Sequence, residues 1–239
     1  MNDTAGVAVR RLPPSVLALS PGTLGPAGVP EFVRRVERAL DGGLEGLLVR
    51  EAALPDSALL ALLSALGPSL RAHDAWLGVH DAAHLAAIDG GDVAGLHLGF
   101  RSLPLDAVRR IVPPGLALGL STHASDDVAS WSTADYLFHG PVRETPSKVG
   151  LLDPVGFEGL SRAVASARAV GAGADAVVGV GGIGVWGIGV WGIGGLRPED
   201  AASVRETGAR GMAVLRGILG ASDPARAATD YREAWEAGA

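Results

Sequence analysis

Short apolar runs alternate along this chain with longer segments in which apolar residues recur every three or four positions. Short runs of this kind are typical of strands buried in a parallel sheet, and the longer period is typical of amphipathic helices. The predicted strands are Val16–Leu19, Gly46–Val49, Trp76–Val79, Gly95–Leu98, Ala117–Ser121, Tyr136–His139, one near 176–193, and Gly211–Leu215. The predicted helices are Val29–Leu40, Asp56–Leu66, Ala82–Ala87, Leu105–Ile111, Ser125–Trp131, Phe157–Val170, Pro198–Thr207 and Pro224–Ala237.

Eight successive strand–helix units in 239 residues predict a single-domain (β/α)8 barrel, an α/β fold that commonly spans 200 to 250 residues. A doubly wound open sheet is the alternative architecture. The units show no change of pattern along the chain, which favours the closed barrel. We expect residues 1–14 to form an N-terminal tail and residues 15–239 to form the barrel.

A pentad, Val-Trp-Gly-Ile-Gly, occurs twice in succession at residues 185–194, within a Gly/Trp-rich insertion at about 181–194. A period of five matches neither a strand, with its period of two, nor a helix, with 3.6. Trp186 and Trp191 would therefore fall on opposite sides of an extended segment. We expect a bulge, a loop or disorder over this repeat.

The composition narrows the chemistry. The chain has no cysteine, which excludes disulfides, thiolate metal sites and cysteine nucleophiles. Its net charge of −6 and its lack of basic clusters disfavour a nucleic-acid or anionic-membrane partner. No run reaches the 18 apolar residues of a membrane span, and the first residues lack the order of a signal peptide. We expect a soluble, cytoplasmic protein.

In a barrel of this type, active groups follow the carboxyl ends of the strands. Arg50 follows the second predicted strand, where it would bind an anionic group or pair with Glu51. Ser121 ends the fifth strand, and Thr145 follows the sixth. We predict that Arg50, Ser121 and Thr145 bind substrate.

Two further residues have a specific chemistry. Lys148 is the only lysine beside 19 arginines, and its ammonium would bind a carboxylate or a phosphate. His123 is the predicted catalytic residue, because an imidazole can both accept and return a proton at neutral pH. The alternative for His123 is a helix cap or a polar gap-filler. His97 lies inside a strand and is interpreted as a satisfied core histidine.

Glycine-rich turns near the last two strands predict a phosphate site, since successive backbone N–H groups bind an oxyanion without a basic side chain. The candidate donors are Gly194, Gly195, Leu215 and Arg216. Gly181-Gly182 is a second candidate for the glycine pair. A metal site is not expected, because His80-Asp81 is matched after the fourth strand by Ser102 rather than by a second carboxylate.

From about Val16 to Ile218 the chain resembles the thiamine-phosphate synthase/TenI superfamily of small (β/α)8 proteins. The segments that carry the resemblance are Leu48-Val49-Arg50-Glu51, Gly95-Leu96-His97-Leu98-Gly99, Gly119-Leu120-Ser121-Thr122-His123, Ala134-Asp135-Tyr136 through Gly140-Pro141 to Thr145 and Lys148, Gly192 to Glu199, and Gly208 to Val214. Taken together they indicate the superfamily, and they decide less well between its two branches.

By resemblance, the synthase branch joins a pyrimidine diphosphate to a thiazole phosphate with Mg2+. It places a lysine where Ala52 stands and a second aspartate where Ser102 stands. These departures are similar to the TenI branch of metal-independent thiazole tautomerases, in which a histidine at the place of His123 moves a proton during aromatisation of a thiazole phosphate carboxylate.

We therefore expect a cofactor-independent isomerase of thiamine biosynthesis, with a small phosphorylated thiazole as its partner and a homodimer as an open option. The alternatives are a thiamine-phosphate synthase, which would need Mg2+, and a non-catalytic thiazole-phosphate-binding relative. Arg216 stands where the superfamily usually has a small residue. It would either block the pocket or add a bond to the phosphate.

Overall fold

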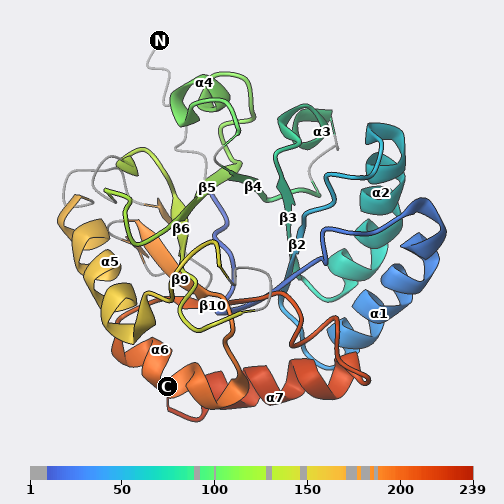
Figure 1. The fold of residues 1–239 in the computed structure, drawn as a ribbon. Coiled ribbons are helices and arrows are strands. Elements are labelled where there is room, and N and C mark those ends of the chain that lie inside the picture. Colours follow the sequence, from blue (N-terminus) through green and yellow to red (C-terminus); the bar gives the residue numbers. More distant parts are fainter. Residues whose placement is uncertain are drawn as a thin grey trace.

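The computed structural model describes residues 10–88, 92–99, 101–127, 131–145, 150–170, 177–178, 184–185 and 188–238. Within them, eight parallel strands form a closed barrel in the order β1-β10-β9-β6-β5-β4-β3-β2, ringed by helices (Figure 1). The barrel strands are β1 Val16–Leu19, β2 Gly46–Val49, β3 Trp76–His80, β4 Gly95–Leu98, β5 Ala117–Thr122, β6 Tyr136–His139, β9 Gly189–Ile193 and β10 Gly211–Val214. The predicted (β/α)8 barrel is confirmed.

The helices follow the predicted order with one exception. They are α1 Val29–Asp41, α2 Asp56–Ala72, α3 Ala83–Ile88, α4 Leu105–Arg109, α5 Gly156–Val170, α6 Ala201–Glu206 and α7 Pro224–Glu236, with short 3-10 helices η1 Pro26–Gly28 and η4 Pro198–Asp200. The helix predicted from Ser125 is wrong over residues 125–127, which form a turn and bend. In the described part of the chain, no helix has the length and apolar character needed to cross a membrane.

The large aromatic side chains inside the barrel include Trp76, Tyr136 and Trp191. Each of these three lies against a glycine of the neighbouring strand. A Cβ on Gly119 would lie 2.1 Å from the Tyr136 ring, and one on Gly95 would lie 2.2 Å from Trp76. Much of the glycine excess therefore has a packing reason, because only glycine leaves room for these rings in so narrow a barrel.

The segment before β1 closes the amino end of the barrel. The Leu12 side chain is buried in the interior cluster with Trp76 and Trp191. The Trp76 indole N–H donates to the Arg11 carbonyl at 2.9 Å, and the Trp191 indole N–H donates to the Pro14 carbonyl at 2.8 Å. The expected tail is therefore wrong for residues 10–14, which plug the barrel. Residues 1–9 lie outside the described residues.

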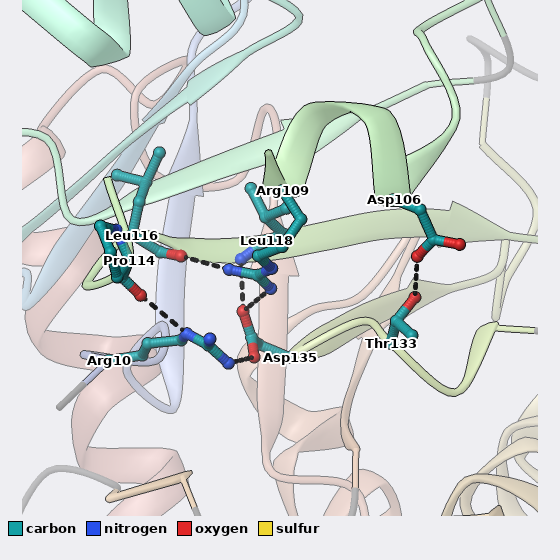
Figure 2. Close-up of polar contacts among 8 residues, drawn as sticks. All are labelled: Arg10, Asp106, Arg109, Pro114, Leu116, Leu118, Thr133 and Asp135. Carbon is teal, nitrogen blue, oxygen red and sulfur yellow. Dashed lines mark hydrogen bonds and ion pairs between the residues drawn. The ribbon is translucent and has the colours of Figure 1, made fainter. Parts of the chain in front are cut away.

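A buried carboxylate ties this segment to the strands. Asp135, just before β6, accepts hydrogen bonds from Arg10 Nη1 at 2.9 Å and from Arg109 Nη2 at 2.5 Å (Figure 2). The Leu118 backbone N–H donates to the same carboxylate at 2.7 Å. The arginines also donate to the carbonyls of Pro114 and Leu116. One anion thus links the N-terminal segment, the region after α4, β5 and β6.

The second copy of the pentad forms a barrel strand. Gly189–Ile193 is β9, which pairs in parallel with β6 and with β10. The expectation of a bulge, a loop or disorder is wrong for these residues, because the Trp191 side chain packs inside the barrel. Upstream, β7 (Val177–Val178) and β8 (Gly184–Val185) pair in an antiparallel ladder outside the barrel. Trp186 lies outside the described residues.

Candidate active site

At the carboxyl end of β2, the adjacent residues Arg50 and Glu51 make different contacts. Glu51 is 3% exposed, and its carboxylate accepts hydrogen bonds from the backbone N–H groups of Gly22 and Leu24, both at 2.8 Å. Among the described residues, the exposed Arg50 guanidinium forms no ion pair. Of the two sequence alternatives, pairing with Glu51 is therefore excluded. The Arg50 side chain is available to an anion.

Next to Arg50, two histidines lie on β3 and β4. Their rings, those of His80 and His97, have centroids 5.8 Å apart. Burial lowers the pKa of His80, and Arg50 lowers it further against the opposing effect of Asp81. Burial, then His80 and Arg50, hold the pKa of His97 well below its ordinary value. His97 is therefore neutral at physiological pH.

His97 contacts Ser121, which the sequence predicted as a substrate-binding residue. The His97 Nε2 atom lies 2.8 Å from Ser121 Oγ, and Ser121 itself is exposed. His97 stacks on Phe138 with ring centroids 4.3 Å apart. Among the described residues, its buried Nδ1 atom has no hydrogen-bond partner. His97 is therefore a core histidine, as the sequence predicted, but it is satisfied only at Nε2, and sequence reasoning missed its link to Ser121.

Asp81 follows β3, at one of the two positions where the resemblance implies a carboxylate ligand of Mg2+. Its side chain accepts hydrogen bonds from Ser102 Oγ and from the Gly99 backbone N–H, and it lies 3.2 Å from His80 Nδ1. The part of the chain that the structure describes contains no group of three or more acidic or histidine side chains able to hold a metal ion. One carboxylate does not make a preformed Mg2+ site, which usually needs several oxygen ligands.

The predicted catalytic residue, His123, begins the turn after β5. Its backbone N–H donates to Asp126 Oδ2 at 2.6 Å, and its carbonyl accepts from the Asp126 N–H at 3.0 Å. The Nδ1 atom is buried and has no partner among the described residues. The nearby His139 is buried too, with Nδ1 3.0 Å from Thr122 Oγ1. The turn fixes the His123 backbone, while among the described residues the ring forms no ion pair.

The ends of β9 and β10 lie side by side. Because Ile193 pairs with Ala213, continuing the register places Gly195 beside Leu215. The backbone N–H groups of Gly194, Gly195, Leu215 and Arg216 have no hydrogen-bond acceptor within the described residues. Both glycines have positive φ angles, +98° and +69°. Such unpaired N–H groups in a glycine turn form a concave anion-binding surface.

The turn is fixed by two residues that sequence reasoning missed. Asp200 is 2% exposed, and it accepts hydrogen bonds from Arg143 and from the Arg197 backbone N–H. The contact joins the loop after β6 to the loop after β9, beside an open cleft of about 650 Å3 that Gly195 also lines. The Arg-Pro-Glu-Asp sequence at 197–200 was the available signal, since an acid at the third helical position caps a helix start.

Four further residues were predicted for the site: Thr145, Lys148, Gly181 and Gly182. Thr145 is half-buried after β6. Lys148 and the alternative glycine pair Gly181-Gly182 lie outside the described residues. The structure therefore brings Arg50 and Ser121 to one mouth with the glycine turn of β9.

Comparison with known proteins indicates one family. The profile described as thiamine monophosphate synthase matches residues 26–218. The thiamine-phosphate synthase of Moorella thermoacetica is 34% identical over 200 residues, which cover 83% of this chain and 85% of that protein. The bifunctional protein ThiM/ThiE of Symbiobacterium thermophilum is 36% identical over 81% of this chain but only 36% of its own length. The solved thiamine phosphate pyrophosphorylase of Pyrococcus furiosus superposes with a TM-score of 0.71 at 25% identity, over 93% of this chain and 96% of that one.

These relatives correct the expected activity. The departures at Ala52 and Ser102 favoured a thiazole tautomerase, yet a relative at 34% identity, covered over 85% of its length, is named thiamine-phosphate synthase. The tautomerase expectation is therefore wrong, and the proton-transfer role of His123 falls with it. Two changed side chains, at Ala52 and Ser102, therefore do not distinguish the two branches in this chain.

Proposed function

Because the chain belongs to the thiamine monophosphate synthase family, we propose that it is a transferase of thiamine biosynthesis that joins a pyrimidine diphosphate to a thiazole phosphate. The product is thiamine phosphate, and diphosphate is released.

The observation that supports this proposal is that donors without acceptors, among the described residues, lie at two separate places around one mouth. Arg50 lies at the end of β2, without an ion pair among the described residues. The unpaired backbone N–H groups of Gly194 and Gly195 lie at the end of β9, three strands away around the barrel. Two positions fit a reaction in which each of two substrates carries phosphate.

The β2 side suits the diphosphate. When the bond to the diphosphate breaks, the bonding electron pair leaves with its oxygen, so negative charge grows there. Arg50 of β2 and the exposed Ser121 hydroxyl of β5, which lies beyond His80 and His97, are the donors proposed for this charge. Donors already in place stabilise a growing charge more than they stabilise the ground state, which lowers the barrier.

The β9 and β10 side suits the thiazole phosphate. Gly194, Gly195 and Leu215 offer backbone N–H groups, and the exposed Arg216 side chain adds a charge beside them. Such a turn binds a phosphate without a dedicated cation. Thr145 and Lys148, which follow β6 in the sequence, are the proposed further contacts to this substrate.

The resemblance implies that the synthase reaction uses Mg2+. Asp81, the one carboxylate at its place, already accepts two hydrogen bonds, and Ser102 replaces the second acid. These residues do not fit a preformed magnesium site. No step of the reaction is therefore assigned to a metal here.

The test is formation of thiamine phosphate from the two precursors, with and without added Mg2+, followed by chromatography. The expected result is product from the wild-type chain, and absence of product under both conditions would overturn the proposal. Arg50→Ala should raise the KM for the pyrimidine diphosphate about tenfold or more, as expected for a lost hydrogen bond to a charged group. Arg162→Ala, at an exposed pair with Glu158 on α5, is the matched control and should change neither KM.

A further inference from the structure

The hydrogen bond between His97 and Ser121 joins a buried ring to an exposed hydroxyl. His97 is 1% exposed, and its ring is fixed by stacking on Phe138 and by the 2.8 Å contact of Nε2 with Ser121 Oγ. Since a neutral imidazole carries one N–H and one bare nitrogen, the direction of this hydrogen bond depends on the tautomer.

The surroundings of Nδ1 select the tautomer. Nδ1 is buried and has no partner within the described residues. A proton there would be a buried N–H without an acceptor, which proteins tolerate less well than an unused acceptor. The proton therefore belongs on Nε2, where it has the Ser121 oxygen as its acceptor.

We propose that His97 is a positioning residue, held as the Nε2–H tautomer, whose ring N–H donates to Ser121 Oγ and thereby leaves the Ser121 O–H free to donate to an anion in the mouth. The opposite tautomer would turn the Ser121 proton inward and present only oxygen lone pairs to the diphosphate. Burial keeps the ring neutral, so this direction does not change across the physiological pH range. The role in catalysis rests on the proposed transferase function, whereas the tautomer itself does not.

The first experiment reads the tautomer directly in the full chain. Protein labelled with 15N at histidine is studied by long-range 1H–15N correlation NMR, with the His97 signals assigned by their loss in His97→Gln. The expected spectrum shows a protonated Nε2 and a bare Nδ1 from pH 6 to pH 8. A protonated Nδ1 would overturn the proposal, whatever reaction the protein catalyses.

The second experiment measures the consequence for anion binding. Calorimetry with inorganic pyrophosphate compares the wild type with Ser121→Ala, His97→Phe and the double variant. Each single change should weaken binding about tenfold, the effect of one lost hydrogen bond to a charged group, and the double variant should be no weaker than Ser121→Ala. Additive losses would mean that the two residues act separately and would overturn the proposal.

A conservative variant separates positioning from simple packing. His97→Gln retains an N–H donor near the place of Nε2, so it should recover most of the pyrophosphate affinity and of the kcat lost in His97→Phe. The KM for the thiazole phosphate should stay unchanged in both variants. If His97→Gln and His97→Phe have the same circular dichroism spectrum and lose equal pyrophosphate affinity and kcat, the positioning role of His97 is contradicted. His84→Gln, at an exposed contact with Asp56, serves as the control.

Discussion

The indole N–H of Trp191 donates a hydrogen bond to the carbonyl oxygen of Pro14 at 2.8 Å, across 177 residues of sequence. This contact joins the strand formed by the second pentad copy to the segment that closes the barrel. The same ring makes an edge contact with Tyr136 at a centroid distance of 6.0 Å. The Trp191 side chain therefore fixes the position of both the second pentad copy and the segment that closes the barrel.

Trp191→Phe should lower the free energy of unfolding by about 1 to 3 kcal/mol, because the half-buried Pro14 carbonyl loses its donor while most of the packing remains. Urea unfolding followed by circular dichroism measures the loss. Trp186→Phe makes the same change in the first pentad copy and should leave the midpoint within experimental error. A larger loss for Trp186→Phe than for Trp191→Phe would show that the other copy forms the strand.

The buried Asp135 supports a second prediction. Asp135→Asn leaves Arg10 and Arg109 without their shared anion, and breaking one side of a buried ion pair costs about 3 to 5 kcal/mol. Urea unfolding should show this loss. Asp106→Asn removes a charge from an exposed contact with Thr133 and should cost less than about 0.5 kcal/mol (Figure 2). Similar losses in the two variants would contradict the assigned role of Asp135.

The sequence predicted the strands to within about one residue wherever a short buried apolar run was flanked by glycine or polar residues, as at Gly46–Val49. It failed for the N-terminal segment, because Leu12 is buried only by strands that arrive later in the chain. It failed for β9 because the repeat offers more than one candidate strand. The hydrophobic pattern of the two copies is the same, so that pattern alone does not show which copy forms the strand.

In the site, the sequence identified residues by their place after each strand, which is a property of barrels. It could not decide the partner of Arg50, because that required knowing that Glu51 accepts two backbone N–H groups from the loop after β1. It also missed His97, since the orphaned Nδ1 atom is visible only in three dimensions. Contacts between strands, rather than residue types, account for these differences.

A third prediction concerns the stability of the protein at acidic pH. Burial, and next the charge of His123, lower the pKa of His139 to about 4 from 6.5. Between pH 6.5 and pH 4 the unfolded chain therefore binds a proton at this site that the folded chain does not. Stability must fall as the pH falls through that window. His139→Gln should show a weaker dependence of the unfolding free energy on pH. The slope should decrease by an amount that corresponds to at most one proton bound on unfolding.

Urea unfolding at intervals between pH 7 and pH 4 measures this slope for both proteins. The carboxylates of the chain contribute equally to each and cancel in the difference. His84→Gln, an exposed histidine on α3, should retain the wild-type slope. Parallel curves for the wild type and His139→Gln would refute the assignment.

The last prediction concerns the duplicated pentad. Residues 184–188 and 189–193 have the same sequence, Gly-Val-Trp-Gly-Ile, but only the second copy is followed by Gly194-Gly195. A slip of five residues would place Val190 at the position of Gly195, where φ is +69° and a Cβ would lie 2.5 Å from the Glu144 carbonyl oxygen. The glycine pair therefore selects which copy enters the barrel, since a β-branched residue is strongly disfavoured there.

Deleting residues 185–189 joins Gly184 to Val190 and leaves one intact copy with its glycine pair. The shortened chain should have the same free energy of unfolding in urea within about 0.5 kcal/mol, because Ile183 and Gly184 then take the places of the buried Ile188 and of Gly189. Gly195→Val in the full chain should cost about 1 to 3 kcal/mol through backbone strain and overlap. If the deletion were the more costly of the two changes, the first copy would be part of the folded barrel and the selection by Gly195 would be disproved.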